Sequence, residues 1–446
     1  MDLDSTHPER IVVVGGGAGG LELAIRLARA TAAPRRARVT LVDRRPTHVW
    51  KPRLHEIATG LLVPSEEAAG YAEQAQAHGF DFVLGEVTGI DPARREVAVA
   101  AVEPPPNDPI ADRRGGAILP QRTLAYDTAV LAVGSTVNDF GTPGVGEHAY
   151  TLDDPDGAER LHRALLAQAA RVKAGLQDTL KVVIVGAGTT GVELAAELRD
   201  AAGRLAQYRS LLHQGQLQVT LVEAAGRPLP QSPESVSDYA RSMLGEHGVA
   251  MRFGVEASAV EADAVRLADG TRLPADIAVW ASGVKAQALA GKVPDARRGK
   301  SGRLATDAEL RVLDEAGAPI PHLYGIGDCA APDEHGKPVG ATAQAASQEA
   351  EHLARSLARQ LRGRAALPFR FHYKGTLVSL GEEGAVGDVP TLHGGVLKIS
   401  GVGARLAYLA LYQQHQVELF GWPRALALAA GGALRRSARP QVKLWW

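Results

Sequence analysis

The chain has 446 residues, which at roughly 150 residues per domain predicts about three domains. Its 45% hydrophobic and 22% charged residues and its net charge of −1 argue against a disordered, collagenous or nucleic-acid-binding protein. The single cysteine, Cys329, excludes an intramolecular disulfide, a redox dithiol and a four-thiolate zinc site.

The N-terminal half begins with a predicted βαβ unit. Residues 1–10 are polar, so no signal peptide is expected and a cytoplasmic protein is favoured. Residues 11–30 (IVVVGGGAGGLELAIRLARA) predict a strand, a glycine-rich turn and a helix, and a second strand follows at 39–43. The turn has the pattern GxGxxG, formed by Gly15, Gly17 and Gly20. Such glycines permit a tight turn, close approach of the backbone to a pyrophosphate and close helix–strand contact. Asp43 ends the second strand, where a carboxylate can accept hydrogen bonds from an adenosine ribose.

Three features follow this unit in the chain. Residues 83–102 predict short strands, 103–114 (EPPPNDPIADRR) a proline- and charge-rich loop, and 126–134 (YDTAVLAVG) a buried strand that ends in glycine.

The first unit is repeated within the chain. Residues 182–201 align without gaps with residues 11–30, and ten of the twenty positions are identical. The glycines of this copy are Gly186, Gly188 and Gly191. Glu223 ends the next strand, and its carboxylate favours a free 2′-hydroxyl, so NADH is predicted rather than NADPH. The long spacing between Gly191 and Glu223 predicts an inserted loop, and nearby Arg227 leaves assistance to a 2′-phosphate open. Two units predict two dinucleotide sites.

The order of the later elements indicates how the domains are connected. Strand and turn signals at 262–283 precede a buried strand that ends in an acid at 323–328 (LYGIGD) and a helix at 341–360. We therefore predict an α/β protein with two Rossmann-like dinucleotide-binding domains, the second inserted into the first. The expected boundaries are 1–155 and 295–378 for the first domain, 156–294 for the second, and 379–446 for a C-terminal region.

The last residues, 401–446, differ from the rest of the chain in charge. They hold six basic residues and one acid, a charge of +5 against −6 for the first 400 residues, together with three of the five tryptophans. Two short helices are predicted, one with an apolar face interrupted by Gln413, the other after Trp422-Pro423 and apolar from Ala425 to Leu434. The face of the first helix consists of Leu406, Leu409, Ala410, Val417 and Phe420. Ten apolar residues do not span a bilayer, which needs about 20, but they suffice to lie at its interface. A helix pair for dimerisation or packing is the alternative.

Taken together, these motifs resemble those of the two-dinucleotide-binding-domain flavoproteins and, more narrowly, of the type II NADH:quinone oxidoreductases. The similarity runs nearly from end to end, and its most family-specific elements are HEIATG at 55–60 and AQxAxQ at 343–348. The other similar segments are 47–54, 126–135, 183–198, 279–286, 323–330, 374–381 and 409–428.

The resemblance implies FAD in the first domain, NADH in the second, and a quinone (ubiquinone or menaquinone) as the electron acceptor. The implied reaction is hydride transfer from NADH to the flavin, followed by two-electron reduction of the quinone to quinol without proton pumping. The resemblance further implies a peripheral or monotopic protein on the cytoplasmic side of the cell (inner) membrane, bound to lipid through residues 401–446. A homodimer stays open.

The resemblance also implies three groups of site residues. The group for FAD is Gly15, Gly17, Ala18, Gly19, Gly20, Asp43, Arg44, Lys51, Thr59, Val87, Ala132, Gly134, Asp328, Ala343 and Gln344. The group for NADH is Gly186, Gly188, Thr189, Thr190, Gly191, Glu193, Glu223 and Gly283. The catalytic group is Glu193 near the nicotinamide, with Gln344 and Gln348 as hydrogen-bond donors to a quinone carbonyl. The histidines show no close metal-ligand spacing, so no metal is predicted.

Purely structural roles stay open for several of these residues. Asp328 is also suited to capping a helix, and Gln348 to a polar helix surface. Glu193 has the same place in its repeat as Glu22, which suggests a shared structural role. Cys329 is expected to be a small buried side chain rather than a nucleophile.

Two other functions stay open. A related flavoprotein that reduces a disulfide or sulfide needs a cysteine pair, which this chain lacks, and a ferredoxin reductase leaves the tryptophan-rich tail unexplained. A flavoprotein that senses NADH by changing shape is expected to bind it tightly and turn over slowly. It would leave the AQxAxQ segment and the tail without a role.

Overall fold

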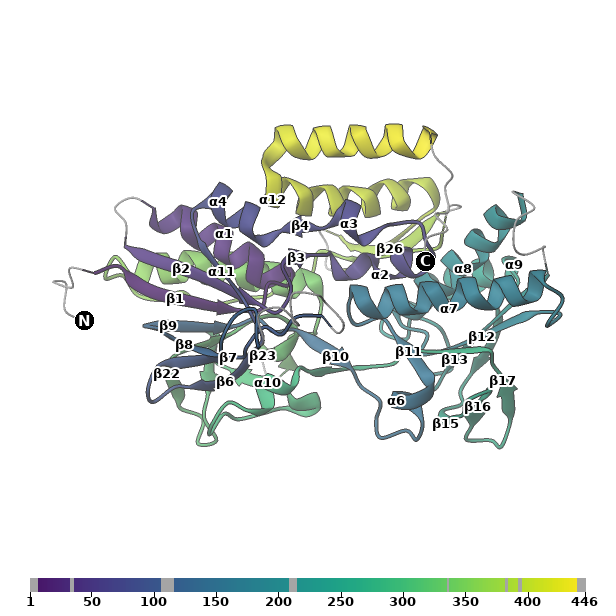
Figure 1. Ribbon diagram of the computed structural model, residues 1–446, viewed down its shortest axis with the longest axis horizontal. Coiled ribbons are helices and arrows are strands. Elements are labelled where there is room, and N and C mark those ends of the chain that lie inside the picture. The colour runs from purple at the N-terminus through teal and green to yellow at the C-terminus, as the bar shows by residue number, and fades with distance from the viewer. Residues whose placement is uncertain are drawn as a thin grey trace. The chain divides into compact units, whose positions relative to one another are not determined.

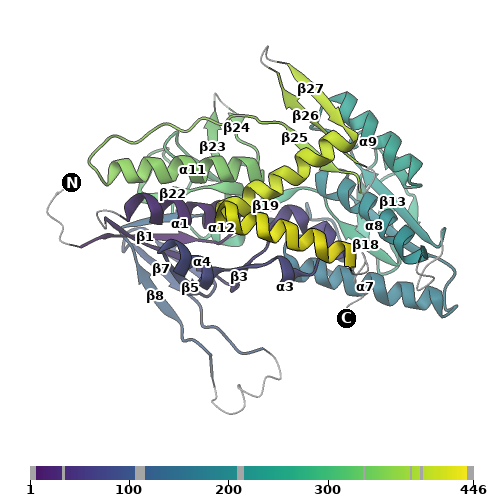
Figure 2. The same cartoon turned by 90° about the horizontal axis from the view of Figure 1, so that it is seen from above.

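A computed structural model describes residues 7–32, 36–105, 116–207, 215–334, 337–381, 384–391 and 395–438. The chain forms two compact units, each of which is discontinuous in sequence (Figures 1 and 2). Unit 1 consists of Met1–Trp50, Ala68–Thr136 and Val284–His372. Unit 2 consists of Lys51–Glu67, Val137–Gly283 and Tyr373–Trp446.

The borders of the units differ from the expected domain borders at 155, 294 and 378. The largest difference is Lys51–Glu67, which contains HEIATG and groups with unit 2 although unit 1 surrounds it in sequence. The reason is packing, because the short helix at Leu54–Ala58 lies against two helices of unit 2 at Pro155–Lys173 and Thr189–Gln207.

Unit 1 is built on a sheet with the strand order β24-β23-β20-β21-β22-β9-β1-β2-β5. The bounds of these strands are β1 Glu9–Val14, β2 Ala37–Asp43, β5 Asp81–Leu84, β9 Thr128–Leu131, β20 Leu304–Thr306, β21 Arg311–Leu313, β22 Pro319–Gly325, β23 Ala330–Glu334 and β24 Lys337–Pro338. Strand β1 pairs in parallel with β2 on one side and with β9 on the other. The predicted strands at 39–43, 126–134 and 323–328 correspond to β2, β9 and β22 of this one sheet, in which β9 and β22 are neighbours and β1 lies between β9 and β2.

Helices α1 (Ala18–Thr31) and α11 (Ala343–Gln360) lie side by side in unit 1 (Figure 2). Thr342 caps the N-terminus of α11, because its hydroxyl accepts a hydrogen bond from Ala345 N at 3.1 Å. The remaining elements of unit 1 are β3 Thr47–His48, β4 Ala69–Gly70, α4 Tyr71–His78, β6 Val87–Asp91, β7 Glu96–Val99, β8 Arg122–Ala125, β19 Val284–Ala286, α10 Ala288–Gly291, η2 Lys300–Gly302 and η3 Gly327–Cys329. Strand β10, Ser135–Val137, crosses into unit 2.

Unit 2 repeats the central arrangement with the strand order β11-β18-β12-β13-β14. Its helices include α7 (Pro155–Lys173) and α8 (Thr189–Gln207). The strand bounds are β11 Ala149–Thr151, β12 Leu180–Val185, β13 Leu217–Glu223, β14 Ala250–Phe253 and β18 Ile277–Trp280. Strand β12 pairs in parallel with β13 and β18, as β1 does with β2 and β9. The repeat seen in twenty residues therefore extends to a whole parallel sheet.

Helix α8 accounts for part of the long spacing to Glu223. It has 19 residues, against 14 in α1, and so adds more than one turn before the next strand. The remaining residues of the expected inserted loop, 208–214, lie outside the described residues. So does most of the predicted loop at 103–114.

The C-terminal part of unit 2 packs a long helix on an antiparallel sheet. The sheet consists of β25 (Thr376–Ser379), β26 (Ala385–Pro390) and β27 (Val396–Ser400). Helix α12 (Gly401–Ala438) is interrupted at Gly421, whose φ of 75° and ψ of 163° are accessible essentially to glycine alone. Its two halves turn back on each other, with Pro423 in the first turn of the second half (Figure 1). The two predicted helices are confirmed.

The faces of α12 are less regular than the sequence predicts. Leu406, Leu409 and Ala410 are exposed, whereas Gln416 is buried. The buried apolar residues in the first half of the helix include Ala404 and Leu419, which do not belong to the predicted apolar face, and part of that predicted face is exposed to solvent. The other elements of unit 2 are η1 Lys51–Arg53, α2 Leu54–Ala58, α3 Pro64–Glu67, α6 Val145–His148, α9 Glu234–Glu246, β15 Ala257–Val260, β16 Ala264–Leu267 and β17 Arg272–Pro274.

Candidate dinucleotide and redox sites

The first glycine-rich turn joins β1 to α1 in unit 1. Gly15 has a φ of 99°, and a Cβ there would clash with the backbone of Ala132, the residue that follows β9. A Cβ on Gly20 would overlap the carbonyl oxygen of Gly15. By contrast, a Cβ on the exposed Gly17 would meet no atom within 4 Å. The first and third glycines thus serve the packing of the turn, while the second leaves open space at the N-terminus of α1, as a pyrophosphate needs.

The second turn joins β12 to α8 in unit 2 and has the same three features. Gly186 has a φ of 108°, and its Cβ would clash with Ala281 after β18. A Cβ on Gly191 would overlap the carbonyl oxygen of Gly186, whereas one on Gly188 would meet nothing within 4 Å. Thr189 and Thr190 begin α8 and are exposed beside this open space. Each unit therefore has a helix N-terminus with room for a phosphate.

Each turn is fastened by the acid that ends the following strand. Asp43 accepts hydrogen bonds from Gly16 N at 2.6 Å and from Arg45 N at 2.8 Å. Glu223 accepts from Ala187 N at 2.7 Å and Ala225 N at 3.0 Å. A carboxylate offers about four acceptor positions, so both acids retain capacity for a ribose hydroxyl.

Other residues expected at FAD come from α1 and from the segments after β2 and β9, whereas Val87 belongs to the separate three-stranded sheet β6-β7-β8. Ala132 N donates to Val14 O at 2.8 Å, and Gly134 follows with a φ of 71°. Gly19 lies against Ala346 of α11, where an added Cβ would approach the Ala346 oxygen to 3.1 Å. The remaining residues are the half-buried Ala18, the exposed Arg44, and Val87, which is buried in β6.

Asp328 lies in η3, the turn after β22, and belongs to a polar cluster in unit 1. The Ser135 hydroxyl donates to Asp328 Oδ2 at 2.7 Å, and Arg303 Nε donates to the Asp328 carbonyl at 3.1 Å. Gly327 N donates to Glu349 Oε2 at 2.5 Å, so Glu349 holds the same turn from α11. Glu349 is buried, and burial raises its pKa to about 8. The sequence analysis did not identify Glu349 or Ser135 as site residues. Glu349 directly follows the AQxAxQ segment, and Ser135 directly follows Gly134.

The AQxAxQ segment forms the first turns of α11. Ala343 and Gln344 open the helix, and Gln348 lies one turn later. Gln348 Nε2 donates to the His372 carbonyl at 2.8 Å, and His372 N donates to Gln348 Oε1 at 2.9 Å. Both ends of this amide are thus engaged with one backbone unit, which favours the structural role for Gln348.

Glu193 lies in α8 of unit 2 and is buried with His55 of α2. Its Oε1 accepts from Ser379 N at 3.0 Å, and its Oε2 lies 3.5 Å from His55 Nδ1. Burial raises the pKa of Glu193 well above its ordinary value and lowers that of His55 to about 4. Burial thus favours the protonated form of the Glu193 carboxyl and the neutral form of the His55 imidazole. Glu22, its counterpart in the first repeat, instead accepts from Arg26 Nε at 2.9 Å.

Three further predicted residues lie in unit 2. Lys51 Nζ is 3.9 Å from Asp153 Oδ1. The Thr59 hydroxyl donates to the carbonyls of His55 and Glu56 at 3.0 and 3.2 Å, so it closes the end of α2. Gly283 is exposed with a φ of 66°, after β18.

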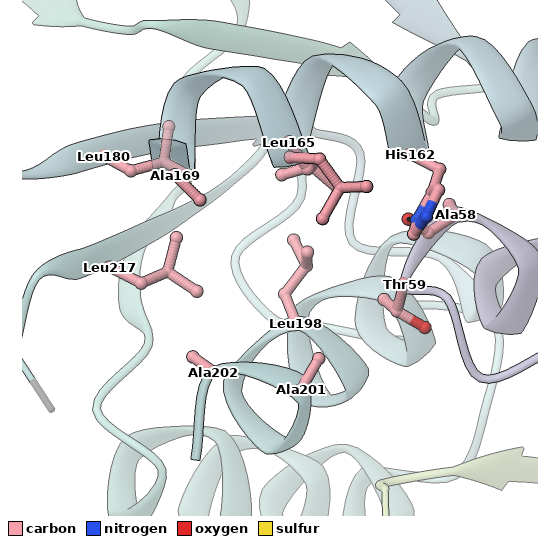
Figure 3. Close-up of a pocket in the computed structure, with 11 residues that line it drawn as sticks. Ala58, Thr59, His162, Leu165, Ala169, Leu180, Leu198, Ala201, Ala202 and Leu217 are labelled. Atoms are coloured by element: carbon pink, nitrogen blue, oxygen red, sulfur yellow. Dashed lines mark hydrogen bonds between the residues drawn. The ribbon is translucent and has the colours of Figure 1, made fainter. Parts of the chain in front are cut away.

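A pocket in unit 2 adjoins the end of α2 (Figure 3). Its walls are aliphatic side chains from α7, α8, β12 and β13, with Thr59 and His162 at one end. Its volume is about 40 Å³, far below the roughly 300–1,000 Å³ of pockets that hold cofactors. It is therefore too small for a nicotinamide or a quinone ring.

The single thiol is inert. Cys329 is fully buried and contacts the carbonyl oxygens of Ile326 and Leu131, and burial raises its pKa to about 12. This confirms the expectation of a small buried side chain. In the described part of the chain, no group of three or more His, Cys, Asp or Glu side chains is arranged to hold a metal ion.

Comparisons with known proteins agree with this geometry. Residues 9–350 match the family model described as pyridine nucleotide-disulphide oxidoreductase. The type II NADH:quinone oxidoreductase of Haemophilus influenzae is 33% identical over 98% of this chain and 100% of that relative. The chain belongs to the type II NADH:quinone oxidoreductases. A further member, from Staphylococcus aureus strain NCTC 8325, is 29% identical over 85% of this chain and 90% of its own length.

Solved structures share the fold. NDH2 from Plasmodium falciparum in complex with NADH has a TM-score of 0.79 and 18% identity, and covers 98% of this chain and 100% of that one. The sulfide:quinone oxidoreductase of Aquifex aeolicus has a TM-score of 0.71 and 16% identity, with 92% and 91% coverage. At these identities the likeness shows the fold alone, an α/β fold with two Rossmann-like domains, as the sequence predicts. None of the helices in the described ranges combines the length and hydropathy of a membrane span.

Proposed function

We propose that unit 1 holds FAD, that unit 2 binds NADH, and that the protein passes the electrons of NADH to a quinone. The overall reaction follows from family membership: NADH is oxidised and a quinone is reduced, without proton pumping. The observation that carries two separate dinucleotide sites is the pair of matching turns, each with open space at its second glycine and an acid that accepts hydrogen bonds from the loop.

The residues of unit 1 fit FAD. Open space at Gly17 and the N-terminus of α1 suit the pyrophosphate, and Asp43 retains acceptor capacity for the adenosine ribose. Asp328 suits the ribityl or pyrophosphate part of FAD. Ser135 donates a hydrogen bond to its side chain, and Glu349 accepts one from the neighbouring Gly327 N. We further propose for FAD the other residues that the family resemblance implies, Lys51 and Thr59 among them. When bound, FAD supplies a ring that accepts a hydride and passes on two electrons.

The residues of unit 2 fit NADH. The pyrophosphate is assigned to the open space at Gly188, with Thr189 and Thr190 at the helix start. Glu223 repels a 2′-phosphate and so selects NADH over NADPH. The alternative role for Arg227 is disfavoured, because its Nη2 donates to the carbonyls of Pro230 and Ser232.

Glu193 is proposed to hold a proton for the reaction. Burial raises the pKa of this carboxyl well above its ordinary value and so favours the form that carries a proton. His55, neutral beside it, and Ser379 N fix its orientation. Gln344 or Gln348 is proposed to donate to a quinone carbonyl, and Gln348 would first have to release His372.

The C-terminal helix is proposed to bind lipid on the cytoplasmic side of the cell (inner) membrane. In its two halves the side chains of Leu406, Trp422 and Leu426 are 63%, 77% and 70% exposed. Large exposed apolar side chains next to a basic segment are typical of helices that lie in a membrane interface. A homodimer formed through the same side chains is the alternative, and size measurement in detergent distinguishes the two.

The deciding experiment is steady-state oxidation of NADH by the full-length, flavin-loaded protein in lipid, with and without a short-chain ubiquinone or menaquinone analogue. We expect strong quinone-dependent turnover that is much weaker with NADPH. A bound flavin that NADH reduces but no quinone reoxidises contradicts the proposal and favours a sensor of NADH.

A further inference from the structure

Helix α2 of unit 2 is too short to persist on its own. It has five residues, whereas isolated helices below about 12–15 residues are marginal even with favourable sequences. It carries the turn Thr59–Leu62, whose amides donate back to carbonyls of His55, Glu56 and Ile57. Contacts from other elements must therefore hold α2 and this turn in place.

Two of these contacts come from the nucleotide-binding part of unit 2. The pair of His55 with Glu193 of α8 fixes one face of α2. The Ala58 carbonyl faces His162 of α7, whose Nδ1 is 3.2 Å away.

The third contact joins α12 to the segment around α2 and consists of five side chains, here called the α12 clamp: Tyr412 and Gln416 of α12, with Arg53, Glu56 and Glu67. Arg53 makes two hydrogen bonds to Glu56, of 2.7 and 2.6 Å, and a third to Glu67 at 3.4 Å. Its guanidinium lies 4.2 Å from the centre of the Tyr412 ring. The Tyr412 hydroxyl donates to Glu67 Oε2 at 2.7 Å and accepts from Gln416 Nε2 at 2.7 Å. One chain of hydrogen bonds thus runs from α12 through Glu67 and Arg53 to α2.

The side chains of the α12 clamp are largely buried, so each of its charged and polar groups depends on the others for hydrogen bonds. The side chains of Arg53 and Glu56 are only 12% and 16% exposed, and Gln416 is buried in a helix that otherwise presents many side chains to solvent. Removing one member of a buried charged network is costly because it leaves the others without compensation. Side chains placed merely to cover α12 would not need this chemistry.

We propose that Tyr412 and Arg53 are positioning residues, through which α12 holds α2 and the turn Thr59–Leu62 in the conformation that the reaction uses. The C-terminal helix is then part of the working enzyme in addition to any contact with lipid. The consequence for turnover rests on the proposed function, in which Thr59 is among the residues proposed for FAD.

The test is hydrogen–deuterium exchange of the Thr59–Leu62 amides in the full-length, flavin-loaded protein. Tyr412→Phe removes only the hydroxyl, and we expect about tenfold faster exchange of these amides. Tyr239→Phe is the matched control, because Tyr239 also lies in unit 2 with a cation, Lys398 Nζ, 5.3 Å from its ring. We expect no change in exchange for the control, and unchanged co-sedimentation with lipid vesicles for both variants.

A double-mutant cycle of Tyr412→Phe with Glu67→Gln provides a second test. It compares amide exchange in the two single variants and in the double variant. If the clamp acts as one unit, the double variant exchanges no faster than the more affected single variant. In the quinone assay, Tyr412→Phe should lower kcat/KM for the quinone and leave the KM for NADH unchanged. Unchanged exchange in Tyr412→Phe, or equal acceleration in Tyr239→Phe, overturns the proposal. Since exchange is measured without substrate, its outcome is independent of whether the protein reduces a quinone.

Discussion

At the scale of single residues, the acids that end β2 and β13 each do two things. Asp43 and Glu223 are engaged by two backbone amides of their own loops. The same carboxylates are the groups proposed to meet a ribose. Replacing either by a small side chain therefore mixes the loss of loop structure with the loss of recognition, and an isosteric amide separates them.

Glu223→Gln is expected to raise the efficiency with NADPH relative to NADH by about tenfold, because it removes a negative charge that repels a 2′-phosphate. An amide oxygen still accepts from one loop amide, so the turn is largely retained. The ratio of kcat/KM values for the two coenzymes is the measurement. Asp43→Asn, at the equivalent place in unit 1, is the control and should leave this ratio unchanged. If the ratio is the same in Glu223→Gln, another residue selects the coenzyme.

Glu349 predicts a dependence of stability on pH. Its pKa of about 8 in the fold lies above the ordinary 4.5, so between these values the folded protein binds more protons than the unfolded chain. The free energy of unfolding therefore falls as the pH rises through this range, by at most about 1.4 kcal/mol per pH unit from this group. Arg303 and Asp328 are the charged groups that act on it.

Glu349→Gln keeps an acceptor for Gly327 N and removes the titration. We expect the variant to lose less stability than the parent between about pH 5 and pH 8. Denaturant midpoints of both proteins across this range provide the comparison. Parallel curves would mean that Glu349 does not titrate there.

At the scale of elements, the two strand–turn–helix units separate glycines that the fold needs from glycines that a ligand needs. A Cβ on Gly191 overlaps backbone, while one on Gly188 enters open space. The sequence pattern treats these positions alike, and only the packing around each distinguishes them.

Gly188→Ala should therefore leave the melting temperature nearly unchanged and raise the KM for NADH, because the methyl group occupies the space proposed for the pyrophosphate. Gly191→Ala should lower the melting temperature by several degrees, since backbone must move to admit the Cβ. Thermal melts and NADH kinetics on both variants test this pair. A Gly188→Ala protein with normal NADH kinetics would contradict the assignment of the second site.

At the scale of the whole molecule, the charge difference between body and tail has a candidate use in lipid binding. Trp422 and Leu426 are four residues apart on the second half of α12 and both strongly exposed. Replacing both by serine should weaken binding to anionic vesicles on the order of tenfold per side chain, because each loses its apolar contact with the membrane interface.

Co-sedimentation with vesicles measures this effect. Leu176→Ser is the control, since Leu176 is 66% exposed in the same unit but lies outside the tail. Raising the salt concentration should weaken binding further if the basic residues contribute. Undiminished binding of the double variant would favour the alternative, in which these side chains pack against a second copy.

The sequence by itself determined the repeated βαβ units, the acids after each second strand, the family and the break in the tail at Gly421-Trp422-Pro423. These features are local: hydrophobic periodicity, glycine spacing and turn chemistry are decided within a few residues of one another. Only the tertiary structure decided that Lys51–Glu67 packs with unit 2, that Gln348 is held by His372, and that Arg53 meets Tyr412. Those contacts join residues from 24 to 359 positions apart. No local sequence pattern specifies which distant residue will contact a given side chain.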